Sequence, residues 1–168
     1  MLCPACGHDN IDGVDICENC GMDLAGLDLP GGGDVIQNPL FKKPLRELPL
    51  KDPIVFGPSA KVLEAVQAMR DRDDGCVFIV DKARRLIGVF TERDLVVRVA
   101  GRGKPPATTR LGEVMTHDPV TLQVGDPLAW ALHRMGVDGH RHLPILDGEK
   151  LVGLLSVRQV MRYLTEEA

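Results

Sequence analysis

Hydrophobic positions recur with helical spacing in a stretch that begins near residue 60, and the same pattern returns about 66 residues later. Side chains three and four positions apart share one face of a helix, so the spacing predicts an amphipathic helix in each stretch. The apolar face of the first helix consists of Val62, Ala65, Val66 and Met69. Ser59 and Asp126 stand where the N-caps of the two helices are expected, and Pro127 suits a first helical turn.

Each predicted helix is followed by two short apolar runs that are typical of buried strands. These runs are "CVFIVD" and "LIGVF" in the first stretch, and "HLPILD" and "LVGLL" in the second. A shorter extended piece, "PIVF" or "PVTL", precedes each helix, and a further helix is expected to begin at Thr91 or Ser156. The order is therefore β-α-β-β-α twice, which indicates a mixed α/β (α+β) fold. Cys76 is predicted to be a buried strand residue.

The two stretches also match residue by residue, which indicates an internal repeat. A shift of 66 residues aligns Asp52 with Asp118, and after the loss of one residue a shift of 65 aligns Gly88 with Gly153. The repeating unit has about 55 residues, and a lone unit of that size would be marginally stable. We therefore expect the two copies to pack as a pseudo-twofold pair around a shared core.

Composition and charge exclude several classes of protein. Aromatic residues make up only 4% of the 168 residues, which disfavours platforms that stack nucleic-acid bases. Residues 1–43 contain seven acidic residues and two lysines, and the rest is close to neutral, so nucleic acid is an unfavourable partner. Neither a membrane span nor a signal peptide is indicated, and a cytoplasmic location is expected.

The N-terminus carries four cysteines in the pattern C-x2-C-x10-C-x2-C: Cys3, Cys6, Cys17 and Cys20. A gap of two residues lets both thiolates of a pair reach one ion, and Gly7 and Gly21 tolerate the tight turns that follow. Four thiolates make a closed structural zinc site, and zinc would fold a segment too short for its own core. Two disulfides, or a redox or other metal site, are the alternatives. His8 lies beside the motif but is not expected to be a ligand.

This cysteine pattern resembles the minimal zinc ribbons that read "CPxCG…CxxCG". The resemblance implies structural zinc and a small docking module for a protein partner. Prolines and a triple glycine follow it and indicate a flexible linker, in which Leu40 and Phe41 are candidates to dock on the next domain. The predicted division is a zinc ribbon at 1–23, a linker at 24–43, and the two repeats at 44–104 and 105–168.

The repeated pattern "DPI…A…AM…VFIVD…LIGVFTERD" resembles a tandem pair of cystathionine β-synthase (CBS) domains, over residues 44–164. The resemblance implies a disc-like homodimer and an adenosine-containing ligand, such as AMP, ADP, ATP or S-adenosylmethionine, bound between the repeats. The motif of the family, G-h-h-[ST]-x-x-D, is present in the first repeat as Gly88, Thr91 and Asp94. It implies that Asp94 binds the ribose hydroxyls and that Thr91 binds a phosphate.

In the second repeat the resemblance implies a ligand contact for Ser156, but Gln159, a weaker ribose acceptor, stands where the motif has an aspartate. The resemblance also assigns further ligand contacts: Ile54, Val55, Val120 and Thr121 beside the adenine, and Arg141 and His142 near the phosphates, with His140 next to them. T-x-x-D and S-x-x-Q at helix starts are equally capping boxes, which need no ligand. The basic residues would equally suit a solvated loop, and the adenine segments plain core strand.

Three classes of function follow from these patterns. The favoured one is a regulatory protein that senses an adenosine ligand and contacts a partner through its ribbon. The alternative is a ligand-free dimerising scaffold that serves a nucleic-acid- or transcription-related zinc-ribbon adaptor. An enzyme is not expected, because the sequence has no Walker loop, no G-x-S-x-G elbow and no open metal site.

Overall fold

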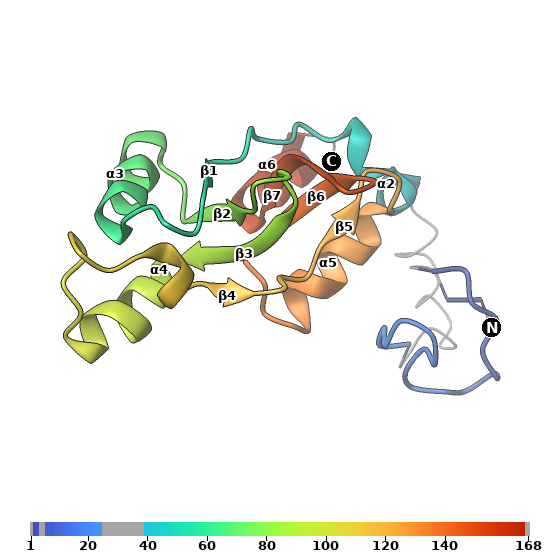
Figure 1. Ribbon diagram of the computed structural model, residues 1–168. Helices are drawn as coiled ribbons and strands as arrows, with labels where there is room; N and C mark the ends of the chain where they lie inside the picture. The colour runs from blue at the N-terminus through green and yellow to red at the C-terminus, as the bar shows by residue number, and fades with distance from the viewer. Residues whose placement is uncertain (1, 4–5, 25–38, 167–168) are drawn as a thin grey trace. The chain divides into compact units, whose positions relative to one another are not determined.

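The computed structural model describes residues 2–3, 6–24 and 39–166 (Figure 1). Most of the predicted linker, residues 25–38, lies outside this part of the chain. The chain divides into two compact units, one from Met1–Pro49 and Val124–Arg141, the other from Leu50–Gln123 and His142–Ala168. Among the described residues, no helix is both long and apolar enough to cross a membrane.

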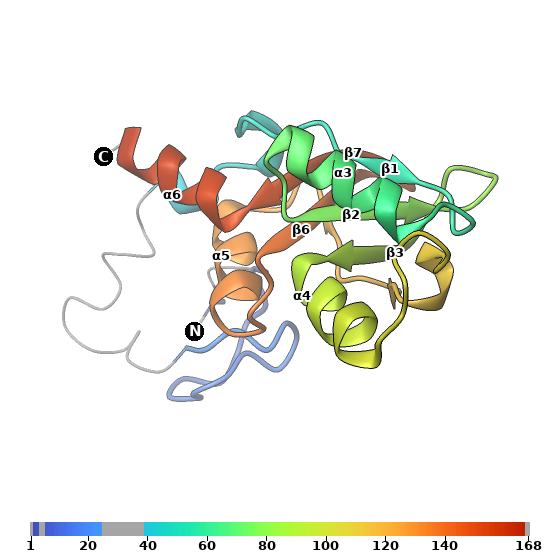
Figure 2. The same cartoon turned by 90° about the vertical axis from the view of Figure 1, so that its left-hand side faces the viewer.

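The larger unit contains two sheets (Figures 1 and 2). The first has the order β1 (Val55–Phe56), β2 (Cys76–Val80), β3 (Leu86–Thr91) and β4 (Thr116–His117), and the second β5 (Leu122–Gln123), β6 (His142–Asp147) and β7 (Lys150–Ser156). In both sheets the first two strands are parallel and the next pair is antiparallel. Its helical segments are α3 (Val62–Arg72), α4 (Glu92–Asp94), the π-helical turn η2 (Leu95–Val99), the 3-10 turns η3 (Ala100–Arg102) and η4 (Leu111–Glu113), and α6 (Val157–Glu166).

The smaller unit contains α2 (Pro39–Lys42), the 3-10 turn η1 (Leu45–Glu47), α5 (Leu128–Gly136) and the cysteine-rich N-terminus. Helix α2 packs against α5, and its apolar residues Leu40 and Phe41 are half-buried. Helix α5 lies between β5 and β6 in the chain, although it belongs to the smaller unit. When it is included, both copies have the element order β-α-β-β-α. The predicted fold class is thereby confirmed.

Strand β2 is buried along its whole length because both of its faces are covered. Val77 and Ile79 belong to the core on the side of α3, which also contains Val62 and Met69. The alternate residues, Cys76 and Phe78, pack on the opposite face against Leu154 of β7 in the second sheet. The two repeats therefore share a core between their sheets, as expected for copies too small to be stable alone.

The repeats also exchange the short segments that precede their first strands, which we call the leading segments (residues 50–52 and 116–118). Strand β4, in the second leading segment, pairs with β3 of the first repeat through Gly88↔His117. Reciprocally, Lys51 of the first leading segment bridges to Leu154 of β7, with backbone N–H···O distances of 3.1 and 2.9 Å. This exchange gives the pair its pseudo-twofold relation. The two-residue strand β4 was not predicted, since it is too short to show a pattern.

The exchanged segments explain the glycine in each repeat of the motif. A Cβ at residue 88 would lie 2.5 Å from Sδ of Met115, and a Cβ at residue 153 would lie 2.9 Å from Cβ of Leu50. Real Cβ atoms do not approach other atoms so closely. Gly153 is thus required by the close crossing of a leading segment, independently of any ligand. At residue 88 the flexible end of Met115 can move aside, but the carbonyl oxygen of Thr116, 3.1 Å from the Cβ position, leaves little room for a side chain.

Replacing Gly153 with alanine is expected to lower the free energy of unfolding by about 1–3 kcal/mol, because the Cβ of Leu50 cannot swing away. Gly136 is the matched control, since it lies in α5 with nothing within 4 Å of its Cβ position. Gly136→Ala is expected to stabilise by up to about 1 kcal/mol through helix propensity. Chemical denaturation of both variants measures the difference, and equal midpoints would contradict the crowding argument.

The predicted N-cap of the first helix is wrong. Helix α3 begins at Val62, and its N-cap residue is Lys61, whose backbone N–H donates to Glu64 Oε2 at 2.6 Å. Lys61 also forms a β-bridge with Arg110. This bridge holds Lys61 itself extended, so that Ser59, in the turn before it, lies too early to cap the helix.

The predicted start of α5 is also wrong. Pro127 is extended, with φ −73° and ψ 151°, and forms a bridge with Pro44. The helix begins one residue later, where the N–H of Leu128 donates to the carbonyl oxygen of Lys43 at 2.9 Å. A backbone carbonyl from a distant segment thus takes the place of the expected Asp126 cap.

Candidate functional sites

Two similar turns carry the four cysteines of the smaller unit. The N–H of Gly7 donates to the carbonyl oxygen of Cys3 at 2.8 Å, and the N–H of Gly21 donates to that of Cys17 at 2.9 Å. Both glycines have positive φ, +71° and +72°, a conformation that residues with a Cβ rarely adopt. The glycine after each cysteine pair is therefore required by the turn, as the sequence predicted.

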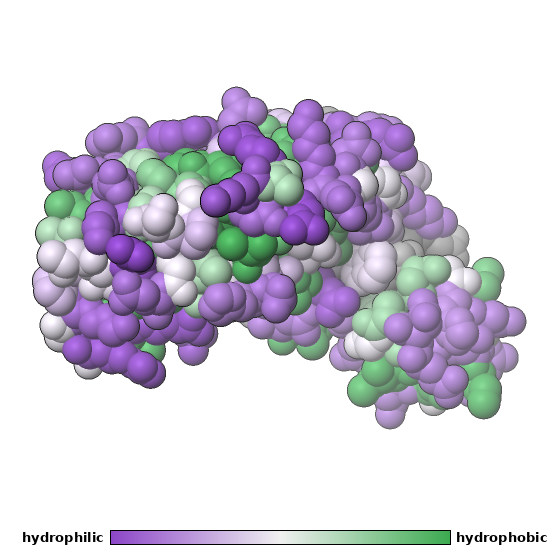
Figure 3. Space-filling view, viewed as in Figure 1, coloured by the Kyte–Doolittle hydropathy of each residue, from purple (hydrophilic) through white to green (hydrophobic). Residues whose placement is uncertain are grey.

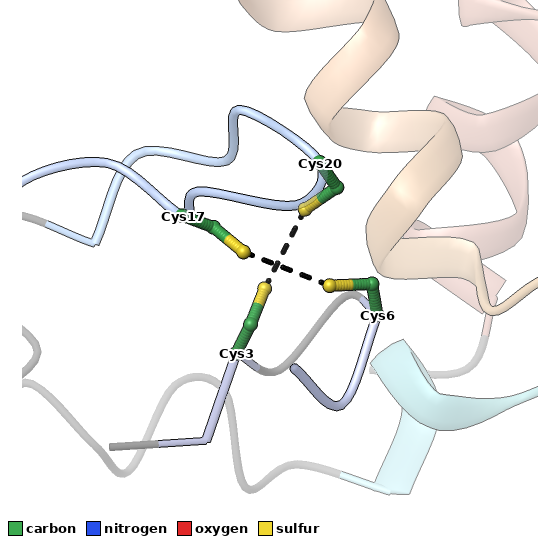
Figure 4. Close-up of side chains that lie close together, drawn as sticks. All are labelled: Cys3, Cys6, Cys17 and Cys20. Carbon is green, nitrogen blue, oxygen red and sulfur yellow. Dashed lines mark hydrogen bonds between the residues drawn. The ribbon is translucent and has the colours of Figure 1, made fainter. Parts of the chain in front are cut away.

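The cysteine side chains point toward one another (Figure 4). The four Sγ atoms lie within 4.8 Å of each other, with Cys3–Cys20 at 3.6 Å and Cys6–Cys17 at 3.7 Å. A disulfide requires about 2.05 Å, so these sulfurs are not bonded to each other. Four sulfurs at about 2.3 Å from a central zinc would be about 3.8 Å apart. The cluster could therefore hold a metal ion, with no position left open.

The surroundings favour thiolates in part of the cluster. Burial opposes the ionisation of Cys17, but the backbone N–H groups of Cys20 and Asn19 stabilise the thiolate and lower its pKa to about 6. Burial raises the pKa of Cys20, and hydrogen bonding with the neighbouring cysteine sulfurs raises it further. Since metal ligands must be thiolates, the cluster is partly prepared for a cation at neutral pH. Among the described residues the group contains cysteines alone, and His8 is not part of it.

The motif of the first repeat forms a complete capping box at the start of α4. Oδ2 of Asp94 accepts from the backbone N–H of Thr91 at 2.9 Å and from its hydroxyl at 2.8 Å, and the N–H of Asp94 donates back to Thr91 Oγ1 at 3.3 Å. Oδ1 has two longer contacts, to Thr116 Oγ1 and to Nε of Arg98, both at 3.3 Å. One carboxylate oxygen is thus committed to the helix cap, and the other is held more loosely.

Arg98 is a site residue that the sequence interpretation missed. Besides its contact with Asp94, its Nη1 donates to the carbonyl oxygens of Met115 at 2.6 Å and Val114 at 3.2 Å. Arg98 therefore balances the charge of the buried carboxylate and fixes the helix to the segment that leads into the second repeat. Its position four residues after Asp94, one helical turn, is the signal that could have revealed it.

The second repeat has the same cap, formed by uncharged residues. Oε1 of Gln159 accepts from the N–H of Ser156 at 2.9 Å and from its hydroxyl at 2.8 Å. The N–H of Gln159 donates to Ser156 Oγ at 3.3 Å. An amide therefore satisfies this cap as well as a carboxylate does. The residue that aligns with Arg98 is Tyr163, so neither charge of the first repeat is present here.

His142 of the second repeat lies close to the cap of the first repeat. Its ring atoms Cε1 and Nε2 are 2.7 and 2.8 Å from the position that a Cβ of Gly75 would occupy. The carbonyl oxygen of Gly75 accepts from the N–H of Glu92, the first residue of α4, at 3.1 Å. The structure therefore brings His142 beside the start of α4. Arg141, by contrast, is exposed and belongs to the smaller unit.

The segments assigned to the adenine differ in their environment. Ile54 is buried in the first repeat's core, and its carbonyl oxygen accepts from the N–H of Phe78 at 2.8 Å. Val55 is half-buried in β1, whereas Val120 is 36% exposed and Thr121 is half-buried. The first segment therefore has a structural role of its own, and the second is the more open of the two.

A buried acidic group lies just before β2. Asp74 is 9% exposed; its Oδ1 accepts from Lys51 Nζ at 2.6 Å, and its Oδ2 has no hydrogen-bond partner among the described residues. Burial, together with the charges of Asp74 and Glu92, raises the pKa of Cys76 to about 12. Cys76 is 1% exposed in β2, so its predicted role as a buried strand thiol is confirmed.

Residues 45–101 and 111–166 each match the family model of the CBS domain. Two copies of this domain account for both repeats and for the sheets described above. The chain therefore belongs to the CBS-domain family and carries the domain in tandem.

Curated relatives share this region. An uncharacterized protein of Methanopyrus kandleri is 31% identical over 117 residues, which cover 69% of this chain and 60% of that protein. The CBS domain-containing protein CBSCBSPB2 of Arabidopsis thaliana is 25% identical over 120 residues, which cover 71% of this chain and 22% of that protein. The chain thus spans less than two thirds of the length of either relative.

Solved structures agree with the fold. An uncharacterized conserved protein of Pyrococcus horikoshii is 26% identical, with a TM-score of 0.68, covering 74% of this chain and 93% of that one. The CBS domain pair of protein MJ0100, solved in complex with 5′-methylthioadenosine and S-adenosyl-L-methionine, is 20% identical, with a TM-score of 0.67, covering 75% and 98%. At 20% identity the second likeness concerns the fold alone.

Proposed function

We propose that this chain is a regulatory protein without catalytic activity, whose CBS pair binds one adenosine-containing ligand at the cap of the first repeat. The observation that carries the proposal is the Thr91–Asp94 cap at the start of α4. His142 of the second repeat lies against Gly75, whose carbonyl oxygen accepts from the N–H of the first residue of α4. The carboxylate would accept from the ribose hydroxyls. The imidazole and the N–H groups at the helix start would suit a phosphate or another anionic group.

The contacts of Asp94 indicate which oxygen would serve the ligand. Oδ2 is held by two short hydrogen bonds from Thr91, whereas Oδ1 has only two contacts of 3.3 Å. The side chain of Arg98 is 39% exposed, and its 3.3 Å contact with Oδ1 is longer than its 2.6 Å hydrogen bond to Met115. Ribose hydroxyls would therefore compete at Oδ1 and leave the cap intact. Gln159 offers no such charged acceptor, so we propose a single ligand per chain.

The second candidate function is a ligand-free scaffold. It is favoured by the completeness of both caps, since Thr91–Asp94 and Ser156–Gln159 satisfy each other without a ligand. In that function the CBS pair would serve to dimerise the chain, and the ribbon alone would carry recognition.

Calorimetric titration with AMP, ADP, ATP and S-adenosylmethionine distinguishes the two functions. We expect saturable binding of at least one ligand, weakened about tenfold or more by Asp94→Asn, because a charged acceptor becomes neutral. The amide should preserve the cap, as Gln159 does, so the melting temperature of the variant should equal that of the wild type. Asp71→Asn, an exposed position in α3, is the matched control and should bind normally.

The outcomes of this titration separate clearly. Binding that Asp94→Asn leaves unchanged would place the ligand elsewhere and refute the assignment of Asp94. Absence of binding by the folded wild-type chain to all four ligands would overturn the sensor and favour the scaffold.

We further propose that the four cysteines hold a structural zinc ion and that the ribbon contacts a basic protein surface. Residues 1–24 contain five acidic residues and no lysine or arginine. Its apolar side chains Leu2, Ile11 and Ile16 are 60–74% exposed, and green areas mark the lower edge of the ribbon in Figure 3. An apolar and acidic surface is suited to a basic protein and repels nucleic-acid phosphates.

Homodimerisation, a cytoplasmic location and the predicted domain limits complete the proposal. Exposed apolar residues on the helical segments of the CBS pair support a second copy as a partner: Val96 and Val97 on η2, and Met161 on α6, are 55–64% exposed. Exposed apolar side chains that gather into a patch are typical of protein–protein interfaces.

A further inference from the structure

The single tryptophan of the chain lies against the cysteine cluster. Cys3, Cys17 and Leu24 form a small core, each 1% exposed, and Trp130 of α5 packs against it. Helix α5 belongs by sequence to the second CBS repeat, so this contact joins the ribbon to the repeat region directly. It does not depend on the intervening linker.

The contact is made by the aromatic ring rather than by a hydrogen bond. Trp130 Nε1 is buried and has no hydrogen-bond partner among the residues that the structure describes, and the same holds for Nε of Arg134. The guanidinium carbon of Arg134 lies 6.0 Å from the centre of the indole ring. Because its N–H is unpaired, the indole is stabilised on the ribbon side by the apolar surface that it covers rather than by a hydrogen bond. Such a contact requires an ordered ribbon opposite the ring.

The ribbon is acidic, with five acidic residues and no lysine or arginine, and zinc with four thiolates would add about −2. Arg134 lies beside the indole ring, but its Nη1 is paired with Oδ2 of Asp138 at 2.9 Å, so it adds little net charge there. The docking surface is therefore mainly the apolar ring of Trp130, which complements the small apolar core of the ribbon.

We infer that the ribbon is a metal-dependent cover for Trp130, so that loss of the metal releases the ribbon from α5. The core that Trp130 contacts contains two of the metal ligands themselves, Cys3 and Cys17. Without the ion so short a segment loses its fold, and the covering surface is lost with it. The inference rests on the proposed zinc site. Its new content is that binding or loss of the metal changes the exposure of Trp130 on α5, a helix of the second repeat.

Tryptophan fluorescence of the full chain tests the inference, because Trp130 is the only emitter of its kind. Chelation of the zinc-loaded protein is expected to shift the emission to longer wavelength and to raise acrylamide quenching several-fold, and added zinc should reverse both. Zinc content is measured in the same samples. A chain that binds no zinc refutes the metal site itself. A chain that binds and releases zinc with unchanged emission and quenching refutes the docking alone.

A pair of substitutions tests the contact without removing the metal. Leu24→Asp places a charge in the core that Trp130 touches, whereas Ile11→Asp places it on a ribbon residue that is 74% exposed. With zinc bound, Leu24→Asp should raise quenching of Trp130 toward the chelated value, and Ile11→Asp should not. Equal quenching in both zinc-loaded variants would overturn the inference. If Leu24→Asp also loses zinc, the chelation result on the wild type decides.

Discussion

Replacing Cys17 with serine is expected to abolish zinc binding and to unfold the ribbon, while the CBS pair stays folded. The apolar core of the described part of the ribbon has only three buried residues, Cys3, Cys17 and Leu24, and two of these belong to the cysteine cluster itself. In segments of this kind the metal supplies the folding free energy, about 10–16 kcal/mol for structural zinc. We expect one zinc ion per wild-type chain and none in the variant. Hydrogen exchange of residues 6–24 should then become fast.

Cys76→Ser is the matched control, since the fifth cysteine is buried in β2, outside the metal group. It should keep the full zinc content, although the buried hydroxyl will lower the stability of the CBS pair slightly. Equal zinc content in the Cys17 and Cys76 variants would contradict the four-cysteine site. Slow exchange in a zinc-free ribbon would show instead that the segment folds by other means.

The second large effect is expected from Leu154→Ala in β7. Leu154 is 1% exposed and packs against Cys76 and Phe78, so truncation leaves a cavity between the two sheets. Comparable substitutions cost about 2–5 kcal/mol. Leu63→Ala, at a position of α3 that is 41% exposed, should change the free energy of unfolding by less than about 1 kcal/mol. Urea denaturation of both variants checks the difference, and a small loss for Leu154 would argue against a core shared by the repeats.

Predictions from the sequence succeeded where one local pattern determines the structure. The apolar runs "CVFIVD" and "HLPILD" contain β2 and β6, because the buried central residues of strands covered on both faces are apolar. The spacing of the cysteines likewise predicted their meeting, since each pair and its glycine form a turn of their own. In both cases the information lies within a few consecutive residues.

Predictions failed where a segment distant in the sequence determines the local structure. Neither Ser59 nor Asp126 caps a helix, because bridges from Arg110 and Pro44 hold the preceding residues extended. The contacts of Arg98 with Met115, and of Trp130 with the ribbon core, depend on which elements the fold brings together. The helical spacing alone shows that such residues share a face. It does not show what that face meets.

The motif illustrates a third case, in which the residues were identified and their role remained open. Thr91 and Asp94 do lie at a helix start, as both the capping and the ligand interpretation require. The structure adds that Oδ2 is used by the cap and that Oδ1 is less firmly held. A single carboxylate can therefore serve both interpretations, one with each oxygen. The sequence could not separate them, because it identifies a residue and not an atom.

The exchange of leading segments also has a consequence for how the chain folds. The bridge between Lys51 and Leu154 joins positions about 100 residues apart, so it closes one of the longest loops in the CBS pair. Contacts of such high sequence separation slow folding, because their loop-closure entropy is lost before they form. During synthesis the first repeat would leave the ribosome with Phe78 uncovered, since its neighbour Leu154 belongs to the last strand. We therefore expect that the first repeat does not fold stably before the second has been synthesised, and that the two repeats fold together in one late step.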